Sequence, residues 1–165
     1  MKFKIANREI GYSEDPLIIA EIGINHNGNL DQAIAIADSA FQAGAEVLKH
    51  QTHIPDEEMS LEALKVIPGN SKHSIYKIIK KCSLSEIDES KLMKYIISKK
   101  KIFISTPFSK AAVDRLVRFK VPAFKIGSGE WNNLELIEYI CKFKKPIIMS
   151  TGMSRLNELI KTVNL

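Results

Sequence analysis

The sequence predicts an α/β fold in which about five parallel strand–helix units form an incomplete (β/α) barrel of the TIM type. Two observations support this prediction. Short apolar runs alternate with longer segments whose apolar residues recur at helical spacing, and repeated strand–helix units imply a parallel sheet. A polar residue of one parity also ends each apolar run: Glu21, Lys49, Thr106, Lys125 and Ser150. Ligands bind at the carboxyl ends of parallel strands, so these residues indicate a binding site.

The expected elements follow one another as strand and helix. Residues 3–12 are expected to form a short hairpin or cap, with turn signals at Asn7 and Gly11. Strands are expected at residues 17–24, 46–52, 101–106, 122–127 and 146–150. Helices are expected at residues 29–43, from residue 85, from residue 109, at residues 133–143 and from residue 154.

Polar residues and glycines mark several helix ends. Asn29 is expected to cap the first helix and Gly44 to stop it. Ser85 precedes a helix with acids in its first turn, whose apolar face is expected to include Ile87. Residues 53–84 form an unusually long connection, which we expect to act as a lid or binding loop.

Length and composition fit one ordinary globular domain over residues 1–165. Hydrophobic residues make up 45% of the chain and charged residues 26%, and the net charge of +5 is moderate. No stripe of basic and aromatic residues favours nucleic-acid binding. No apolar run is long enough to span a membrane, and the first residues lack the pattern of a signal peptide. Cys82 and Cys141 form no disulfide framework, and Cys141 is expected in the core, so we expect a cytoplasmic protein.

The polar residues at the strand ends are expected to converge. Side chains alternate between the two faces of a strand, so residues of one parity share a face. Each charged residue taken alone is equally well explained as the solvated end of a strand. Five polar residues of the same parity favour a site for a small phosphorylated substrate. The glycine-containing turns at residues 23–28 and 127–130 suit a bound anion, although the same glycines would serve tight turns.

Three histidines raise the question of a metal. His50 and His53 lie at a spacing that sends them to opposite faces of a strand, and His26 in a loop could join His53 at the mouth. We expect no metal site made wholly within this chain. His50 is expected to have a structural role, through hydrogen bonds to loop carbonyls.

Six runs of sequence resemble the bacterial N-acetylneuraminate (sialic acid) synthase family. They lie at residues 22–28, 49–53, 67–70, 105–109, 125–130 and 150–153. The runs at 49–53 and 67–70 favour the neuraminate branch over the legionaminate and pseudaminate synthases. The resemblance implies condensation of phosphoenolpyruvate with N-acetylmannosamine to give N-acetylneuraminate and phosphate. It also implies a divalent metal, Mn²⁺, and a homodimer for the complete enzyme.

The resemblance also implies roles for individual residues. The residues that match the phosphoenolpyruvate-binding positions are Lys49, Thr106, Lys125, Ser128 and Ser150. Glu21, Gln51 and Asn70 match the positions around the sugar, with Glu21 acting on it. Glu130 is the residue expected to handle the proton of the attacking water.

The chain departs from the family pattern in three ways. Trp131 stands where a small residue is expected, and the metal-binding histidines and the C-terminal antifreeze-like domain of the family are absent. The chain is therefore expected to be the N-terminal portion of a synthase barrel, inactive on its own. The alternatives are a related nonulosonate synthase, or a non-catalytic half-barrel fragment that binds a phosphorylated ligand or a partner chain.

Overall fold

The computed structural model describes residues 2–164, which form one five-stranded parallel sheet and one antiparallel hairpin. The sheet has the order β3 (Ile19–Gly23), β4 (Val47–Thr52), β5 (Ile102–Pro107), β6 (Phe124–Ile126) and β7 (Ile147–Met149). All four neighbouring pairs are parallel, as predicted from the repeated strand–helix units. Within the described residues β3 and β7 do not pair with each other, so the sheet stays open.

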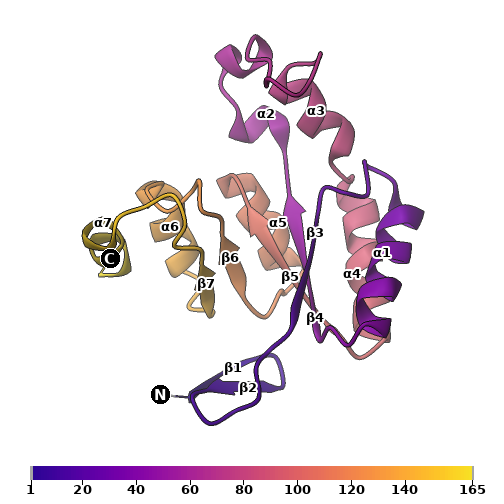
Figure 1. Ribbon diagram of the computed structural model, residues 1–165, viewed down its shortest axis with the longest axis vertical. Coiled ribbons are helices and arrows are strands. Elements are labelled where there is room, and N and C mark those ends of the chain that lie inside the picture. Colours follow the sequence, from indigo (N-terminus) through magenta and orange to yellow (C-terminus); the bar gives the residue numbers. More distant parts are fainter. Residues whose placement is uncertain (1, 165) are drawn as a thin grey trace.

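Helices cover one face of this curved sheet (Figure 1). They are α1 (Leu30–Gln42), α4 (Glu86–Ser98), α5 (Lys110–Arg118), α6 (Leu134–Cys141) and α7 (Leu156–Val163). Asn29 and Ser85 accept hydrogen bonds from backbone N–H groups of the first turns of α1 and α4, as expected of capping residues. Gly44 follows α1 with a φ of +96°, a left-handed conformation that favours glycine. No helix within residues 2–164 is long and apolar enough to cross a membrane.

The long connection between β4 and α4 is largely helical. It contains α2 (Pro55–Glu58), a 3₁₀ helix η1 (Leu61–Leu64) and α3 (Ile75–Cys82), and it projects beyond the carboxyl end of β4 (Figure 1). Pro55 occupies the first helical position of α2, and Ser74 caps α3. These local start signals explain why the long connection predicted from the sequence contains helices.

Two side chains lie elsewhere than predicted. Ile87, expected on the apolar face of α4, is exposed, whereas Glu89 on the same helix is buried. Cys141, expected in the core, is exposed at the last residue of α6. The buried residues of α4 and α6 recur at helical spacing, and Ile87 and Cys141 lie outside the buried stripe of their helices.

The sheet has a separate core on each face. The larger core lies between the sheet and the helices and includes Leu48, Phe103 and Phe124. The smaller core lies on the inner face and includes Val47, Ile104 and Ala123. Ile5 joins the inner core from the hairpin of β1 (Lys2–Ile5) and β2 (Arg8–Gly11), which lies at the amino ends of the strands (Figure 1). The hairpin therefore covers the bottom of the inner face and leaves the carboxyl end accessible.

Candidate active site

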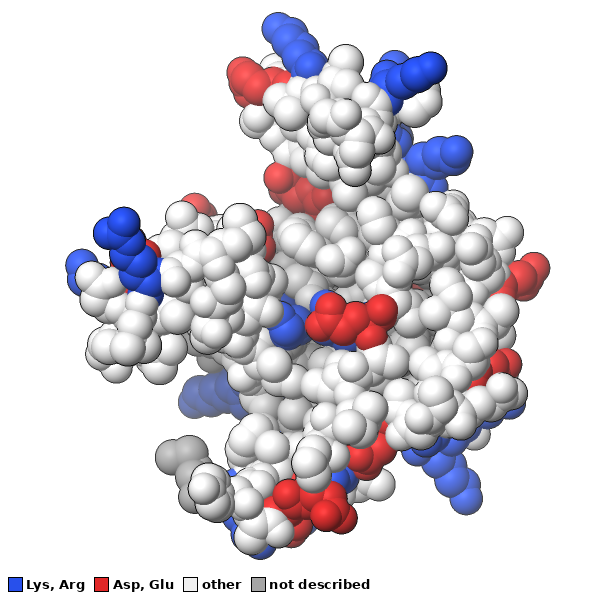
Figure 2. All heavy atoms as spheres, in the orientation of Figure 1, with Lys and Arg blue, Asp and Glu red and all other residues white. Residues whose placement is uncertain are grey.

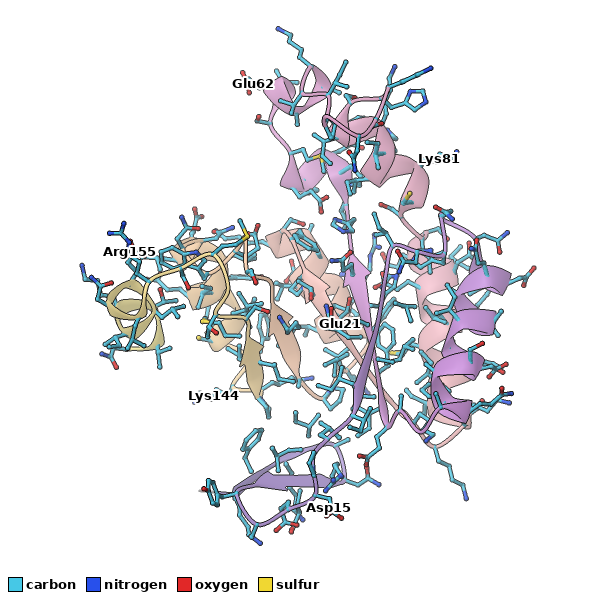
Figure 3. All side chains as sticks on the ribbon, in the orientation of Figure 1. Asp15, Glu21, Glu62, Lys81, Lys144 and Arg155 are labelled. Atoms are coloured by element: carbon cyan, nitrogen blue, oxygen red, sulfur yellow. The ribbon has the colours of Figure 1, made fainter. Side chains whose placement is uncertain are left out.

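The five polar residues at the strand ends share the parity of the inner core. Glu21, Lys49, Thr106 and Lys125 lie two residues beyond apolar residues of the inner core or packed against it, and Ser150 lies two beyond Ile148. In Figure 3, Glu21 lies at the centre of the sheet, with side chains from neighbouring strands around it. The predicted convergence of these residues on one face is therefore what the structure shows.

Lys49 and Glu21 form an ion pair across neighbouring strands. The Lys49 Nζ lies 3.4 Å from Glu21 Oε2, and the two residues are partners in the β3–β4 register. The lysine side chain is 7% exposed, whereas the glutamate side chain is 63% exposed. Figure 2 shows acidic atoms at the centre of this face with basic atoms deeper beside them. The ammonium group is thus held inside the site, and its carboxylate partner lies at the surface.

Lys125 is a second buried cation on the same face. Its Nζ donates hydrogen bonds to Ser150 Oγ and, at 2.8 Å, to the carbonyl oxygen of Ile126. Burial lowers the pKa of Lys125, the nearby positive charge of Lys49 lowers it further, and Glu21 acts in the opposite sense. Two ammonium groups and one carboxylate therefore share this face, which leaves a surplus positive charge suited to an anion.

Two neutral side chains lie between the charged groups. Thr106 is buried, and its Oγ1 has no hydrogen-bond partner among the described residues. Gln51 faces Thr106 in the β4–β5 register. A Cβ atom added to Gly23 would lie 3.4 Å from Gln51 Oε1, so the turn after β3 passes close to this amide. Both side chains can bond a ligand without adding charge.

The turns after β6 and β7 meet beside Lys125. A Cβ atom added to Gly152 would lie 3.1 Å from Ser128 Oγ, so the two turns are in close contact. Glu130 Oε2 accepts a hydrogen bond of 2.9 Å from Asn133 Nδ2 at the start of α6. Trp131 is half-buried, and its carbonyl oxygen accepts a hydrogen bond from Thr162 of α7.

Asn70 is exposed in the turn before α3, within the segment that projects from the carboxyl end of β4. The segment between β4 and α4 that contains it lies beyond the carboxyl end of β4 (Figure 1). Its proposed contact with a sugar stays a prediction.

The helix-covered face of β4 carries a buried hydrogen-bond network that the sequence did not predict. His50 Nδ1 lies 3.1 Å from Glu89 Oε1, and His50 Nε2 lies 3.1 Å from His26 Nε2. The prediction that His50 bonds to loop carbonyls is therefore wrong. The expectation that His26 could join His53 at the mouth is also wrong, because His26 is fully buried against His50.

Glu89 is the centre of this network. One oxygen accepts a hydrogen bond from Thr52 Oγ1, and the other lies 3.1 Å from Arg115 Nη1. Thr52 Oγ1 also lies 2.7 Å from Ser105 Oγ. The signal in the sequence was an acid in phase with the apolar residues of its own helix, since Glu89 precedes Leu92 by three residues and both are buried.

The hydrogen bonds of the network define the protonation of its histidines. The backbone N–H of Gly28 donates to His26 Nδ1 at 3.2 Å, so the proton of neutral His26 lies on Nε2 and is donated to His50. His50 then carries its proton on Nδ1 and donates it to Glu89. Burial, reinforced by the neighbouring His50, lowers the pKa of His26 from 6.5 to about 4. The turn after β3 is therefore linked to α4 through His26 and His50.

The described residues do not offer a site for Mn²⁺. No three His, Cys, Asp or Glu side chains within residues 2–164 are arranged around a common point. His26 and His50 are bonded to each other and to Glu89, which in turn pairs with Arg115. Glu21, the carboxylate that pairs with a cation of the inner face among the described residues, is bound to Lys49. No step of the chemistry below is therefore assigned to a metal.

The open (β/α) sheet, with two buried lysines at its carboxyl edge, defines a domain of the barrel type. The chain belongs to the NeuB family, because the model of that family matches residues 16–165. The resemblance drawn from the six sequence runs is thereby confirmed for the family.

Several curated relatives have related sequences. The spore coat polysaccharide biosynthesis protein SpsE of Bacillus subtilis is 34% identical over 95% of this chain and 42% of its own length. The N,N'-diacetyllegionaminic acid synthase of Campylobacter jejuni is 35% identical over 90% of this chain and 46% of its own. The human N-acetylneuraminate-9-phosphate synthase is 31% identical over 92% of this chain and 43% of its own. The chain thus spans less than half the length of these relatives.

Solved structures confirm the fold. The N-acetylneuraminic acid synthetase of Leptospira borgpetersenii, solved with citrate, superposes with a TM-score of 0.85 at 24% identity, covering 99% of this chain and 54% of that one. The crystal structure of B. subtilis SpsE superposes with a TM-score of 0.77 at 31% identity, covering 98% of this chain and 43% of that one. The five parallel strands therefore correspond to part of a TIM-barrel synthase.

Proposed function

We propose that this chain forms the phosphoenolpyruvate-binding part of a synthase that condenses phosphoenolpyruvate with N-acetylmannosamine, giving N-acetylneuraminate and phosphate. The observation that carries the proposal is the pair of buried lysines, Lys49 and Lys125, facing one exposed carboxylate. Phosphoenolpyruvate has a phosphate and a carboxylate a few ångströms apart, and two ammonium groups on one face match them. The names of the relatives, which are synthases of sialic, legionaminic and pseudaminic acids, support the reaction class.

The residues of the inner face divide between the two substrates. Lys49 and Lys125 give charge-assisted hydrogen bonds to the anionic groups of phosphoenolpyruvate, which are stronger than neutral ones. Hydroxyl groups of Thr106, Ser128 and Ser150 complete the contacts to phosphate oxygens. The buried and unpaired Oγ1 of Thr106 supports this role, since a buried hydroxyl normally has a partner.

The acceptor sugar is placed against Glu21, Gln51 and Asn70. C3 of phosphoenolpyruvate forms a bond with the aldehyde carbon of the open-chain sugar, and the aldehyde oxygen takes up a proton. Water adds to the resulting cation at C2 and loses a proton, for which Glu130 is the proposed acceptor. The bond between C2 and the bridging oxygen then breaks, and inorganic phosphate leaves with that oxygen. Positioning by the fixed strand ends is the main contribution of this chain to that sequence of steps.

The acceptor could also be a different sugar. The legionaminic and pseudaminic acid synthases of C. jejuni are 35% and 34% identical to this chain, so a related nonulosonate synthase is the second candidate function. A non-catalytic half-barrel that only binds a phosphorylated ligand is the third, since the sheet is open at β7 in the described residues. We also propose that the complete enzyme is a cytoplasmic homodimer that uses Mn²⁺ held by residues outside this chain.

Calorimetric titration of phosphoenolpyruvate into the purified chain tests the binding proposal. We expect one site per chain, weakened by salt because the contacts are ionic, and competed by inorganic phosphate. Phosphate release is then measured with N-acetylmannosamine and Mn²⁺ present. Binding without phosphate release is the expected result for this chain alone. Absence of phosphoenolpyruvate binding would contradict the proposal, and release matched by N-acetylneuraminate would show that the open sheet already assembles a working site.

A further inference from the structure

His53 is a buried histidine of the inner face with one nitrogen left free. It lies two residues beyond Gln51 and is 8% exposed. Its Nδ1 lies 2.8 Å from Glu58 Oε1, and its Nε2 is buried without a hydrogen-bond partner among the described residues. Buried polar atoms in native proteins are nearly always paired, so the free Nε2 calls for a partner that the chain does not supply.

Two contacts hold the imidazole in this orientation. The ring stacks on Phe108, which follows β5, with centroids 4.2 Å apart and an angle of 11° between the planes. Glu58 of α2 is itself buried, with its side chain 4% exposed, and its second oxygen accepts the backbone N–H of Ile54 at 3.2 Å. The ring therefore cannot rotate without losing either the stack or the hydrogen bond to Glu58.

The bond to Glu58 decides what His53 Nε2 offers. A carboxylate oxygen only accepts hydrogen bonds, so the proton shared with Glu58 belongs to Nδ1. Neutral His53 then presents the lone pair of Nε2, which accepts a hydrogen bond. This is the same orienting arrangement that carboxylates impose on histidines in catalytic and metal sites.

The lone pair distinguishes between the two substrates of the proposed reaction. Phosphoenolpyruvate presents phosphate and carboxylate oxygens, which accept hydrogen bonds and would repel a lone pair. An N-acetylated sugar presents hydroxyl and amide N–H groups, which donate. The neighbours of His53 on this face fit the sugar side, since Gln51 precedes it and the lysines lie deeper along the strands.

We propose that His53 binds the acceptor sugar by accepting a hydrogen bond from a hydroxyl or amide N–H group at Nε2 of the neutral ring, and that Glu58 is the positioning residue that fixes the ring proton on Nδ1. The inference rests on the proposed function, because it assumes a sugar acceptor beside phosphoenolpyruvate. It adds to the site His53, the residue that follows β4, and Glu58 of the projecting segment.

Nitrogen-15 NMR of the imidazole rings tests the proposal in the intact chain. The sequence has four histidines, His26, His50, His53 and His73, so each ring can be assigned by substitution. Near pH 7.5 we expect His53 to show an Nδ1–H tautomer with an unprotonated Nε2. Addition of phosphoenolpyruvate alone should leave the Nε2 resonance nearly unchanged. N-acetylmannosamine added afterwards should shift it towards the position of a nitrogen that accepts a hydrogen bond.

Three variants separate the contact from a structural role. His53→Phe keeps the stack on Phe108 but has no nitrogen, so it should bind N-acetylmannosamine at least tenfold more weakly and phosphoenolpyruvate unchanged. His53→Gln, whose side-chain oxygen reaches the place of Nε2, should recover part of the loss. His73→Phe, at an exposed residue, is the matched control.

The outcomes distinguish this inference from the proposed function. Binding of phosphoenolpyruvate together with an unmoved His53 resonance, or equal sugar affinity in His53→Phe, would overturn the role of His53 alone. A protonated Nε2 in the free chain would overturn it as well. Failure of the chain to bind phosphoenolpyruvate would overturn the proposed function and this inference with it.

Discussion

On the helix-covered face of β4, His50 and Thr52 are buried and their side-chain polar atoms are bonded to Glu89, His26 and Ser105. On the inner face of the same strand, Lys49 has one exposed carboxylate partner, and His53 beyond the strand end keeps an unpaired nitrogen. Both faces carry buried polar groups, but the polar side-chain atoms of His50 and Thr52 are paired within the protein, whereas Thr106 Oγ1 and His53 Nε2 on the inner side have no partner among the described residues. Paired buried groups stabilise the fold, whereas unpaired ones are available to a ligand.

The largest effect is expected from removing Glu89, the centre of the hydrogen-bond network on the helix-covered face. Glu89→Ala deletes the acceptor of three side chains and leaves Arg115 partly buried without its closest carboxylate. Loss of one member of a buried pair typically costs about 3–5 kcal/mol. Urea unfolding should show this loss, while Glu135→Ala at an exposed surface pair should leave the midpoint nearly unchanged. Equal midpoints for both variants would show that the network is not structural.

The second test uses pH on the same network. The pKa of His26 is lowered from 6.5 to about 4 in the folded chain, so the unfolded chain binds its proton first as the pH falls. The stabilisation from keeping His26 neutral is complete above pH 6.5 and is lost as the pH falls towards 4. The linkage relation gives a loss of about 3 kcal/mol over this window.

Urea unfolding between pH 7.5 and 4.5 measures this slope. The His26→Gln variant should be less stable at pH 7.5 and should show a flatter dependence, because it lacks the titrating ring. A wild-type curve as flat as that of the variant would contradict the assignment of a neutral, buried His26.

The inner face should respond in the opposite way. Lys125→Ala removes a buried cation whose pKa is already lowered by burial, so unfolding stability should stay unchanged or rise. Binding of phosphoenolpyruvate should weaken by roughly 1.5–3 kcal/mol, about 10–150-fold, for a lost charge-assisted contact. Calorimetry measures the affinity, with Lys110→Ala as an exposed control. A destabilised variant with unchanged affinity would place Lys125 with the structural residues.

The smallest effect is expected at Glu21. Glu21→Gln keeps the shape of the side chain and removes the negative charge beside Lys49, so phosphoenolpyruvate should bind a few-fold more tightly. The gain should shrink at high salt, because the carboxylate is largely exposed. Weaker binding in this variant would mean that Glu21 orients Lys49 for phosphoenolpyruvate and does not serve the sugar.

Much of the inner face could be predicted from the sequence. Strand residues alternate with a period of two, so Lys49 and Lys125 could be assigned to one face from their distance to Val47 and Ala123 alone. The helix caps at Asn29 and Ser85 follow equally local rules. These predictions needed no knowledge of which elements touch.

The hydrogen-bond network around Glu89 could not be predicted, because its members come together only in the folded chain. Glu89 lies 39 residues from His50 in sequence and looks like an ordinary acid in the first turn of a helix. The pairing of His26 with His50 likewise depends on how the turn after β3 folds over the edge of β4. Local pattern gives the face of a residue, but its partner comes from tertiary packing.

The alternation along β4 restricts how this strand can change over evolution. A single inserted or deleted residue would shift the register and exchange the two faces beyond that point. Lys49 and Gln51 would then lie among the helices, and His50 and Thr52 would face the substrates. The projecting segment after β4 can accommodate changes in length, because it lies outside the sheet. Substitutions within β4 are therefore expected to keep the character of the face on which the residue lies. Changes in length are expected in the segments outside the sheet.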